Sequence, residues 1–227
     1  MGRGAQRLGT RRGHDVGVMF SFLKGAADRR PFALPLFLLK TVLFPGGVLP
    51  LKVFEQRYIE MAKACLKDGG PFGVCLITQG EEVARNAGDV PQFAAVGTMA
   101  ALSAWDMPQL GILHVTATGG VRFQVQSHIV QPDGLVVAMV TRIPVEPAVA
   151  LPEGYAPLAK LLELLASRVG TRQFPEVHSF DDASWVGHRL AELLPLPLAV
   201  KQGMLEINDS EVRLQLLQKF LHQQGLL

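Results

Sequence analysis

The spacing of apolar residues changes past the middle of this 227-residue chain, and this change limits the folds open to it. Up to about residue 145 the apolar stretches have the length and alternation of β-strands, whereas beyond residue 158 leucines recur every three or four positions, as on one face of a helix. Four prolines between Pro144 and Pro157 separate the patterns, because proline continues neither a strand ladder nor a helix interior. We therefore expect an α+β protein with a β-rich subdomain over 32–146, a proline-rich linker over 147–157 and a helical subdomain over 158–227.

One helix is expected inside the β-rich part. The segment 55–68 places Tyr58, Met61 and Cys65 on one face and ends at a pair of glycines. This pattern predicts an amphipathic helix that covers one end of a barrel. The apolar run 72–78 that follows has the length of a buried strand.

Three further strands are expected to form an antiparallel meander. Gly119-Gly120 predicts a tight hairpin turn between strands over 110–118 and 121–126, because glycine tolerates the positive φ angles of such turns. Pro132-Asp133-Gly134 predicts the turn into a strand over 135–143. Antiparallel strands joined by glycine-rich turns favour a small barrel or a sandwich.

The helical part is expected to pack leucine-rich faces together. Asp181-Asp182 and Asp209 stand directly before helix-forming segments, where an aspartate caps the first turn and complements the helix dipole. We interpret the aspartate pair as such a cap, because general acid-base catalysis would require a cleft around it. The residues expected to face inward are Leu158, Leu161, Leu162, Leu165, Val169, Val186, Leu190, Leu193, Leu194, Leu214, Leu217 and Leu221.

Charge and cysteine content argue against several function classes. Residues 1–30 carry seven Lys or Arg against two Asp, which predicts a disordered basic tail over 1–31. A start at Met19 and a basic arm that touches acidic partners are the alternatives. The tail therefore carries a net charge of +5, and because the whole chain carries +2, the rest carries −3. A negatively charged body makes nucleic-acid binding unfavourable. Two cysteines, no secretory signal and no apolar run of membrane-spanning length indicate a cytoplasmic protein without a membrane partner.

A dense group of motifs lies between residues 34 and 62. An FPGG turn at 44–47 follows an apolar run, and Phe54, Glu55, Arg57 and Tyr58 form the pattern FE-x-RY. Further along stand GEEVAR (80–85), VGTMA (96–100), GGVRF (119–123) and a leucine-rich segment over 190–217. In this order and spacing the segments resemble the LON domain, the N-terminal substrate-recognition part of Lon ATP-dependent proteases. The match is best to stand-alone LON-domain proteins, and it covers the chain apart from the basic tail.

The resemblance implies a mainly antiparallel PUA-like pseudo-β-barrel followed by a C-terminal helical bundle. It also implies a binding module without catalytic residues, since the ATPase and the Ser-Lys peptidase of Lon occupy other domains. The sequence agrees, because it contains no Gly-Lys pair of a phosphate-binding loop and no segment that resembles the peptidase. We expect no enzyme activity, so that a Lon or peptidase label would describe ancestry only, and we expect no cofactor. A metal site is not expected either, because the six histidines lack the spacing of metal ligands.

The motif residues have a structural and a functional interpretation. Glu55 and Arg57 would suit a charged ligand, but we favour a structural interpretation. In it, Glu55 stands at the start of a helix and Arg57 ties that helix to the barrel. Arg122 lies on the polar face of an alternating strand, which is expected to be wet, and is interpreted as an anchor of the meander edge. The residues assigned a structural role are Phe54, Glu55, Arg57, Tyr58, Gly97, Gly120 and Arg122.

Polypeptide recognition requires an adaptable apolar surface, for which Met and Trp are suited. The candidates are Phe93, Met99, Trp105 and Met107, with a core position as the alternative, favoured more for Phe93 and Met99. The expected partners are unfolded or specific client proteins. The domain would then act alone as a holdase or adaptor, or deliver clients to a separate protease ring. RNA binding of the PUA-like type is the alternative function, and an enzyme or small-molecule receptor that uses the barrel mouth is a third.

Overall fold

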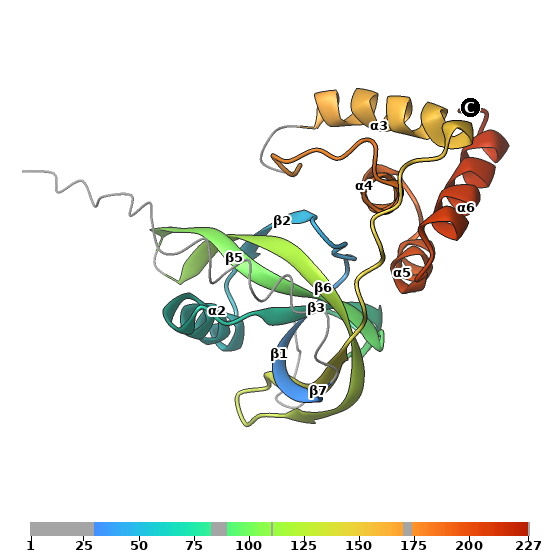
Figure 1. The fold of residues 1–227 in the computed structure, drawn as a ribbon. Helices are drawn as coiled ribbons and strands as arrows, with labels where there is room; N and C mark the ends of the chain where they lie inside the picture. The colour runs from blue at the N-terminus through green and yellow to red at the C-terminus, as the bar shows by residue number, and fades with distance from the viewer. Residues whose placement is uncertain (1–29, 83–89, 110, 170–173, 227) are drawn as a thin grey trace, which may run out of the picture.

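Strands, with helix α2 among them, occupy the first part of the chain, and helices occupy the last part (Figure 1). The computed structural model describes residues 30–82, 90–109, 111–169 and 174–226. The predicted basic tail, apart from its last two positions, and half of the GEEVAR segment lie outside the described residues. The elements are β1 (Phe32–Leu39), β2 (Val48–Val53), α2 (Gln56–Asp68), β3 (Phe72–Gln79), β4 (Gln92–Phe93), β5 (Val96–Gln109), β6 (Ile112–Val130), β7 (Val136–Arg142), η1 (Glu153–Tyr155), α3 (Ala156–Arg168), α4 (Ala183–Leu193), α5 (Leu198–Glu206) and α6 (Ser210–Gln223).

Five of the described strands close into a ring. Antiparallel pairs run in the order β1-β7-β6-β5-β3, and β3 returns to β1 as a parallel pair in which Leu36 lies opposite Gly73. β2 pairs with β6, and β4 pairs with β3, outside this ring. The parallel pair and the register shifts in β5 and β6 make the ring a pseudo-barrel. The predicted α+β fold, a mainly antiparallel pseudo-barrel followed by C-terminal helices, is confirmed.

Helix α2 ends where the sequence predicts and begins one residue later. Gly69 stops it in the left-handed conformation with a φ of 67°. Its inner face buries Tyr58, Met61 and Cys65 in one apolar cluster with Phe72 of β3 and Val115 of β6. The amphipathic pattern therefore places α2 against the strands β2, β3, β5 and β6, in a cluster separate from the one that fills the ring around Met99.

The predicted hairpin turn at Gly119-Gly120 is wrong. Both glycines lie inside the continuous strand β6, and the turn between β5 and β6 instead contains Gly111, with a φ of 81°. Gly119 exchanges two backbone hydrogen bonds with the FPGG loop (44–47), both at 2.8 Å. A Cβ atom at Gly119 would overlap the carbonyl oxygen of Phe44. Glycine is therefore required at this position for the close approach of the loop and not for a positive φ.

The helical part packs around α4. Asp182 and Asp209 cap α4 and α6, as predicted, by accepting hydrogen bonds from backbone N–H groups of the first turns. The inner faces carry the predicted leucines, which remove apolar surface from water and so hold the helices together. The predicted apolar side chains with no exposed surface are Leu158 and Leu162 of α3, Val186 and Leu190 of α4, and Leu214, Leu217 and Leu221 of α6.

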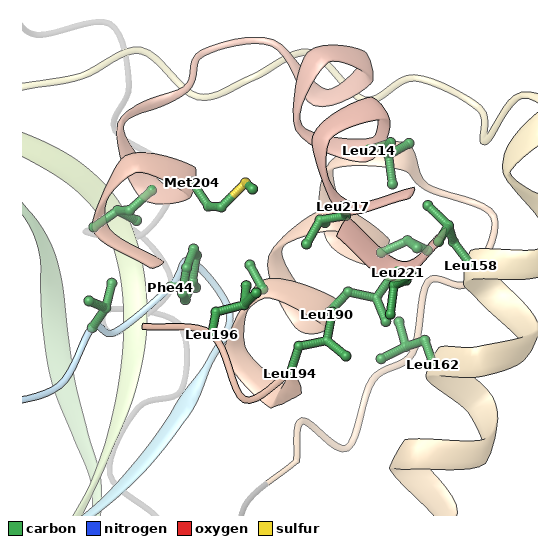
Figure 2. Packing of buried hydrophobic residues seen from close by; sticks show 14 of the residues in the cluster. Phe44, Leu158, Leu162, Leu190, Leu194, Leu196, Met204, Leu214, Leu217 and Leu221 are labelled. Atoms are coloured by element: carbon green, nitrogen blue, oxygen red, sulfur yellow. The ribbon is translucent and has the colours of Figure 1, made fainter. Parts of the chain in front are cut away.

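The β-rich and helical parts share this apolar cluster (Figure 2). Phe44 of the FPGG loop is fully buried and lies beside Leu196 and Met204 of the helical part. Residues 147–157, the predicted linker, run along the start of α4, where the Leu151 N–H donates to the Asp181 carbonyl at 2.7 Å. The subdomain boundaries stay a prediction, but the described contacts join both parts through one continuous core.

We expect Gly119→Ala to lower the free energy of unfolding by about 1–3 kcal/mol, because the added methyl group meets backbone that is itself hydrogen-bonded. Urea unfolding followed by far-UV circular dichroism measures the change. Gly203→Ala is the matched control, since a Cβ atom there meets no atom within 4 Å on an exposed turn of α5. It should raise stability by about 0.5–1 kcal/mol. Equal stability of the two variants would contradict the close-approach interpretation.

Candidate functional site

The hairpin of β5 and β6 forms an arm (101–109 and 111–118) that extends away from the ring (Figure 1). β3 pairs with β5 only over 98–100. Beyond that point β5 continues to its end, and the seven residues over 103–109 are all exposed. The inner edge of this segment pairs with β6, and no described strand pairs with its outer edge. The arm therefore presents a free sheet edge to solvent.

Two large apolar side chains stand on this free strand. Trp105 is 60% exposed and Met107 is 36% exposed. Trp105 lies opposite Val115 of β6, which in turn lies opposite Leu51 of β2. Because directly opposite residues share one face of a sheet, Trp105 continues the apolar row that is buried under α2. The row leaves the core at Trp105, where its apolar surface meets water.

The four residues predicted to bind polypeptide do not form one surface. Met99 is 2% exposed and packs in the interior cluster of the ring, which corrects its assignment to a binding surface. Phe93 is half-buried on β4, with its ring 5.1 Å from that of His128. Trp105 and Met107 remain together on the arm. The sequence missed this separation because β5 is one continuous strand that changes from interior to exposed along its length.

The FE-x-RY motif joins α2 to the barrel. Arg57 Nη2 lies 2.8 Å from Glu55 Oε2, and Arg57 Nη1 donates to the Gly134 carbonyl at 2.9 Å. This second bond ties the first turn of α2 to the turn between β6 and β7. The Tyr58 ring stacks on Phe37 with centroids 4.1 Å apart. Phe54 is the exception, since it is 56% exposed at the end of β2.

A buried carboxylate links the two parts of the molecule. Glu146, from the segment after β7, accepts two hydrogen bonds from the guanidinium of Arg213 at 2.9 and 2.5 Å. Its Oε1 atom lies 3.2 Å from Nη2 of Arg122, and the Ser184 hydroxyl donates to its Oε2 atom at 2.8 Å. Arg122 is 3% exposed, so the expectation that its face of β6 is wet is wrong. The helical part covers that face.

Both arginines also serve the end of α5. Arg122 Nη1 donates to the carbonyls of Leu205 at 2.6 Å and Ile207 at 2.8 Å, and Arg213 Nε donates to that of Met204 at 2.9 Å. These carbonyls belong to the last turn, where a helix leaves acceptors without intrahelical donors and carries partial negative charge. Sequence analysis missed Glu146 and Arg213 as partners, because 67 residues separate them and no local pattern connects them.

His188 of α4 lies beside this cluster and is buried without a hydrogen bond at Nε2. Burial, with Arg213, Arg189 and Arg122 nearby, holds the pKa of His188 well below its usual value of 6.5. The imidazole is therefore neutral at pH 7, and its approach to Glu146 at 3.7 Å is not an ion pair. Its role is to fill the joint between the parts, next to Phe44, whose ring centroid is 5.8 Å away.

Other candidate chemistry is sparse over the described ranges. Burial raises the pKa of the Cys65 thiol to about 11 and that of the Cys75 thiol to about 12, which makes both poor nucleophiles. No group of three His, Cys, Asp or Glu side chains that suits a metal ion occurs there. No helix among these residues has the length and apolar character needed to cross a membrane.

Known proteins share this architecture. The family model of the ATP-dependent protease La (LON) substrate-binding domain matches residues 33–223. The chain belongs to the LON substrate-binding domain family. The crystal structure of a Lon N-terminal domain protein from Xanthomonas campestris is 36% identical over 83% of this chain and 98% of that chain, with a TM-score of 0.68. The N-terminal domain of Mycobacterium avium complex Lon protease is 19% identical over 82% and 96% of the two chains, with a TM-score of 0.56, and shows the shared fold. A search of curated proteins found no match.

Glycines of the LON motifs lie at close contacts in this fold. A Cβ atom on Gly97 would lie 2.5 Å from the Val74 carbonyl oxygen and 2.7 Å from the Cys75 sulfur. Gly120 follows the tight contact at Gly119 and lines a groove of about 440 Å³ at the joint between the two parts. The LON motifs of this chain therefore mark packing of the ring, whereas Trp105 and Met107 lie outside them.

We expect Glu146→Gln to lower the free energy of unfolding by about 3 kcal/mol, because two buried guanidinium groups lose their counter-charge. Guanidinium chloride carries its own charge, so urea is the denaturant of choice. Glu60→Gln is the matched control, since Glu60 pairs with Lys63 on the exposed face of α2. That variant should change stability by less than about 0.5 kcal/mol. A loss of similar size in both variants would count against a buried ionic joint.

The stability of the LON domain should fall as the pH drops below 6.5, partly through His188. Its folded-state pKa is depressed, so below pH 6.5 the unfolded chain takes up a proton that the folded chain does not. Above pH 6.5 both states are neutral at this residue, and it adds no pH dependence. Urea unfolding between pH 7.5 and 5 should show a shallower decline for His188→Gln than for the wild type. An equal decline in the two proteins would contradict this role of His188.

Proposed function

We propose that this LON domain binds extended apolar segments of other polypeptides along the outer edge of β5, without breaking bonds. The observation that carries the proposal is the exposed run 103–109, in which Trp105 and Met107 accompany a free strand edge. A substrate-binding family is consistent with it. The partners would be unfolded or specific client proteins in the cytoplasm.

The free edge supplies backbone recognition. An unpaired strand edge offers N–H and C=O groups at regular spacing, so that an extended peptide adds to the sheet as a further strand. Such hydrogen bonds are independent of side-chain sequence, which suits a protein with many clients. Pro108 has no N–H group, and register shifts interrupt the pairing with β6 within the arm. Both features limit the length of strand that pairs and protect the edge against association with itself.

The two side chains supply apolar burial. Trp offers a large, rigid contact surface, and Met adapts its shape to different partners. Because Trp105 and Val115 share one face, a segment added beside β5 would extend the same apolar row. Partners are therefore selected for apolar residues at alternate positions.

Two uses of such a module fit the family. It would hold a client alone, or pass the client to a separate protease ring. An adaptor speeds client degradation when added to the ring, whereas a holdase slows it. The alternative of RNA binding receives no support from the family or the structural matches and is not proposed.

We expect Trp105→Ser/Met107→Ser to weaken binding of a labelled, permanently unfolded polypeptide by about thirtyfold, because loss of an aromatic anchor costs about 2 kcal/mol. Fluorescence anisotropy without nucleotide measures the affinity. The matched control is Ile129→Ser/Val130→Ser, which removes two exposed apolar side chains from the far end of β6. Unchanged affinity in the arm variant would remove the arm as the binding site.

A direct readout comes from tryptophan emission. The chain has only two tryptophans, so Trp185→Phe leaves Trp105 as the sole reporter. Addition of an unfolded polypeptide without tryptophan should shift the emission of Trp105 to shorter wavelength as its exposed surface becomes buried. A gel of the same samples should show the polypeptide intact, and cleavage would contradict the non-catalytic part of the proposal.

A further inference from the structure

A second apolar groove lies on the helical part, between α3 and the segment 174–180. Its volume is about 520 Å³, within the range of pockets that hold small ligands or side chains. One side of the groove is lined by Ala166 of α3 and by Val169, which directly follows α3. The opposite side is lined by Phe174, His178 and Phe180. None of these residues belongs to the arm, so the groove is separate from the proposed polypeptide site.

The aromatic wall of the groove is supported from behind. Trp185 of α4 meets Phe180 edge to face with centroids 5.1 Å apart, and it meets Phe174 in the same way at 5.8 Å. The His178 ring contacts Phe174 at 5.3 Å and Phe180 at 5.4 Å. Edge-to-face contacts at these separations are favourable and fix the orientation of the rings. The wall is thus a preformed aromatic surface rather than loosely placed side chains.

The described lining of the groove carries two negative charges. Glu163 of α3 and Glu176 line it, and both side chains are exposed. Within the described parts of the chain, neither carboxylate forms an ion pair or a hydrogen bond, and no Lys or Arg lines the groove. By contrast, the buried Glu146 and Glu192 are paired with arginines. Two unpaired carboxylates beside an aromatic wall form a site that complements an organic cation.

Among polypeptide side chains, arginine fits this combination best. Its planar guanidinium stacks on aromatic rings and forms paired hydrogen bonds to carboxylates, and its methylene groups pack on apolar surface. We propose that the groove binds a polypeptide segment in which an arginine is flanked by apolar residues, with Glu163 and Glu176 receiving the charge. This goes beyond the proposed function, because it assigns a second site with a different preference.

The test uses the peptide acetyl-Ser-Leu-Arg-Leu-Ser-amide and the full chain. Trp105→Phe leaves Trp185, in contact with the wall, as the only tryptophan, so its emission responds to changes at the wall and not on the arm. Titration with the peptide should change this emission to saturation. The same peptide with citrulline in place of arginine keeps the shape but loses the charge, and should bind about three- to tenfold more weakly. Equal binding of the two peptides would overturn the proposal.

Charge removal in the groove gives the reciprocal result. Glu163→Gln/Glu176→Gln, in the Trp105→Phe background, should weaken binding of the arginine peptide by about three- to tenfold and leave the citrulline peptide unaffected. Glu153→Gln/Glu211→Gln removes the same net charge from exposed positions of the helical part outside the groove, and should leave both affinities unchanged.

The failure of this proposal is distinguishable from failure of the arm proposal. Trp105→Ser/Met107→Ser should not alter peptide binding at the groove, since the two sites share no residue. A loss in that variant together with an unchanged Glu163→Gln/Glu176→Gln variant would move the arginine preference to the arm and overturn the groove. No saturable change of Trp185 emission with either peptide would overturn it as well.

Discussion

The Glu146 carboxylate is the interaction on which the arrangement of the two parts depends. It receives Arg122 from the ring and Arg213 from α6, and these arginines bind the last carbonyls of α5. Burying three charges is costly unless each is paired and hydrogen-bonded, and the cluster meets that condition with Ser184 as a further donor. Because the pairs are directional, they fix how the helical part sits on β6, which the apolar cluster around Phe44 alone would not do.

This joint explains why the two proposed sites are left free. The helical part covers the ring near Arg122, whereas the outer edge of β5 continues along the arm without a described neighbouring strand. β2 pairs with β6 along the arm, so three strands support its base and keep Trp105 on a defined face. The groove beside residues 174–180 depends on the first turn of α4, which carries Trp185 one turn before His188. A single helix therefore carries both the joint and the support of the aromatic wall.

Local patterns predicted the elements whose causes are local. The stop of α2 at two glycines and the caps by Asp182 and Asp209 follow from residues a few positions apart. The prediction of a turn at Gly119-Gly120 was wrong for the same reason. A glycine pair gives the same local pattern whether the chain turns there or another segment packs closely against it. Arg122 alternates like a solvent-facing residue, and only the distant segments that bury it make it an internal anchor. Met99 and Trp105 lie six positions apart on one strand, and only the tertiary path of β5 decides that one is core and the other exposed.

The two proposed sites read different features of a polypeptide. In these proposals the arm recognises backbone and alternate apolar side chains, whereas the groove recognises one cation in an apolar setting. Each contact alone is weak, because an exposed ion pair contributes about 1 kcal/mol or less and a short strand addition leaves much of the partner in water. A chain long enough to reach both sites gains from the effective concentration of the second contact once the first has formed. Folded proteins bury their apolar strands, so only unfolded or extended segments would meet both requirements, and the proposed preference for such clients follows from the presence of two sites and not from the affinity of either.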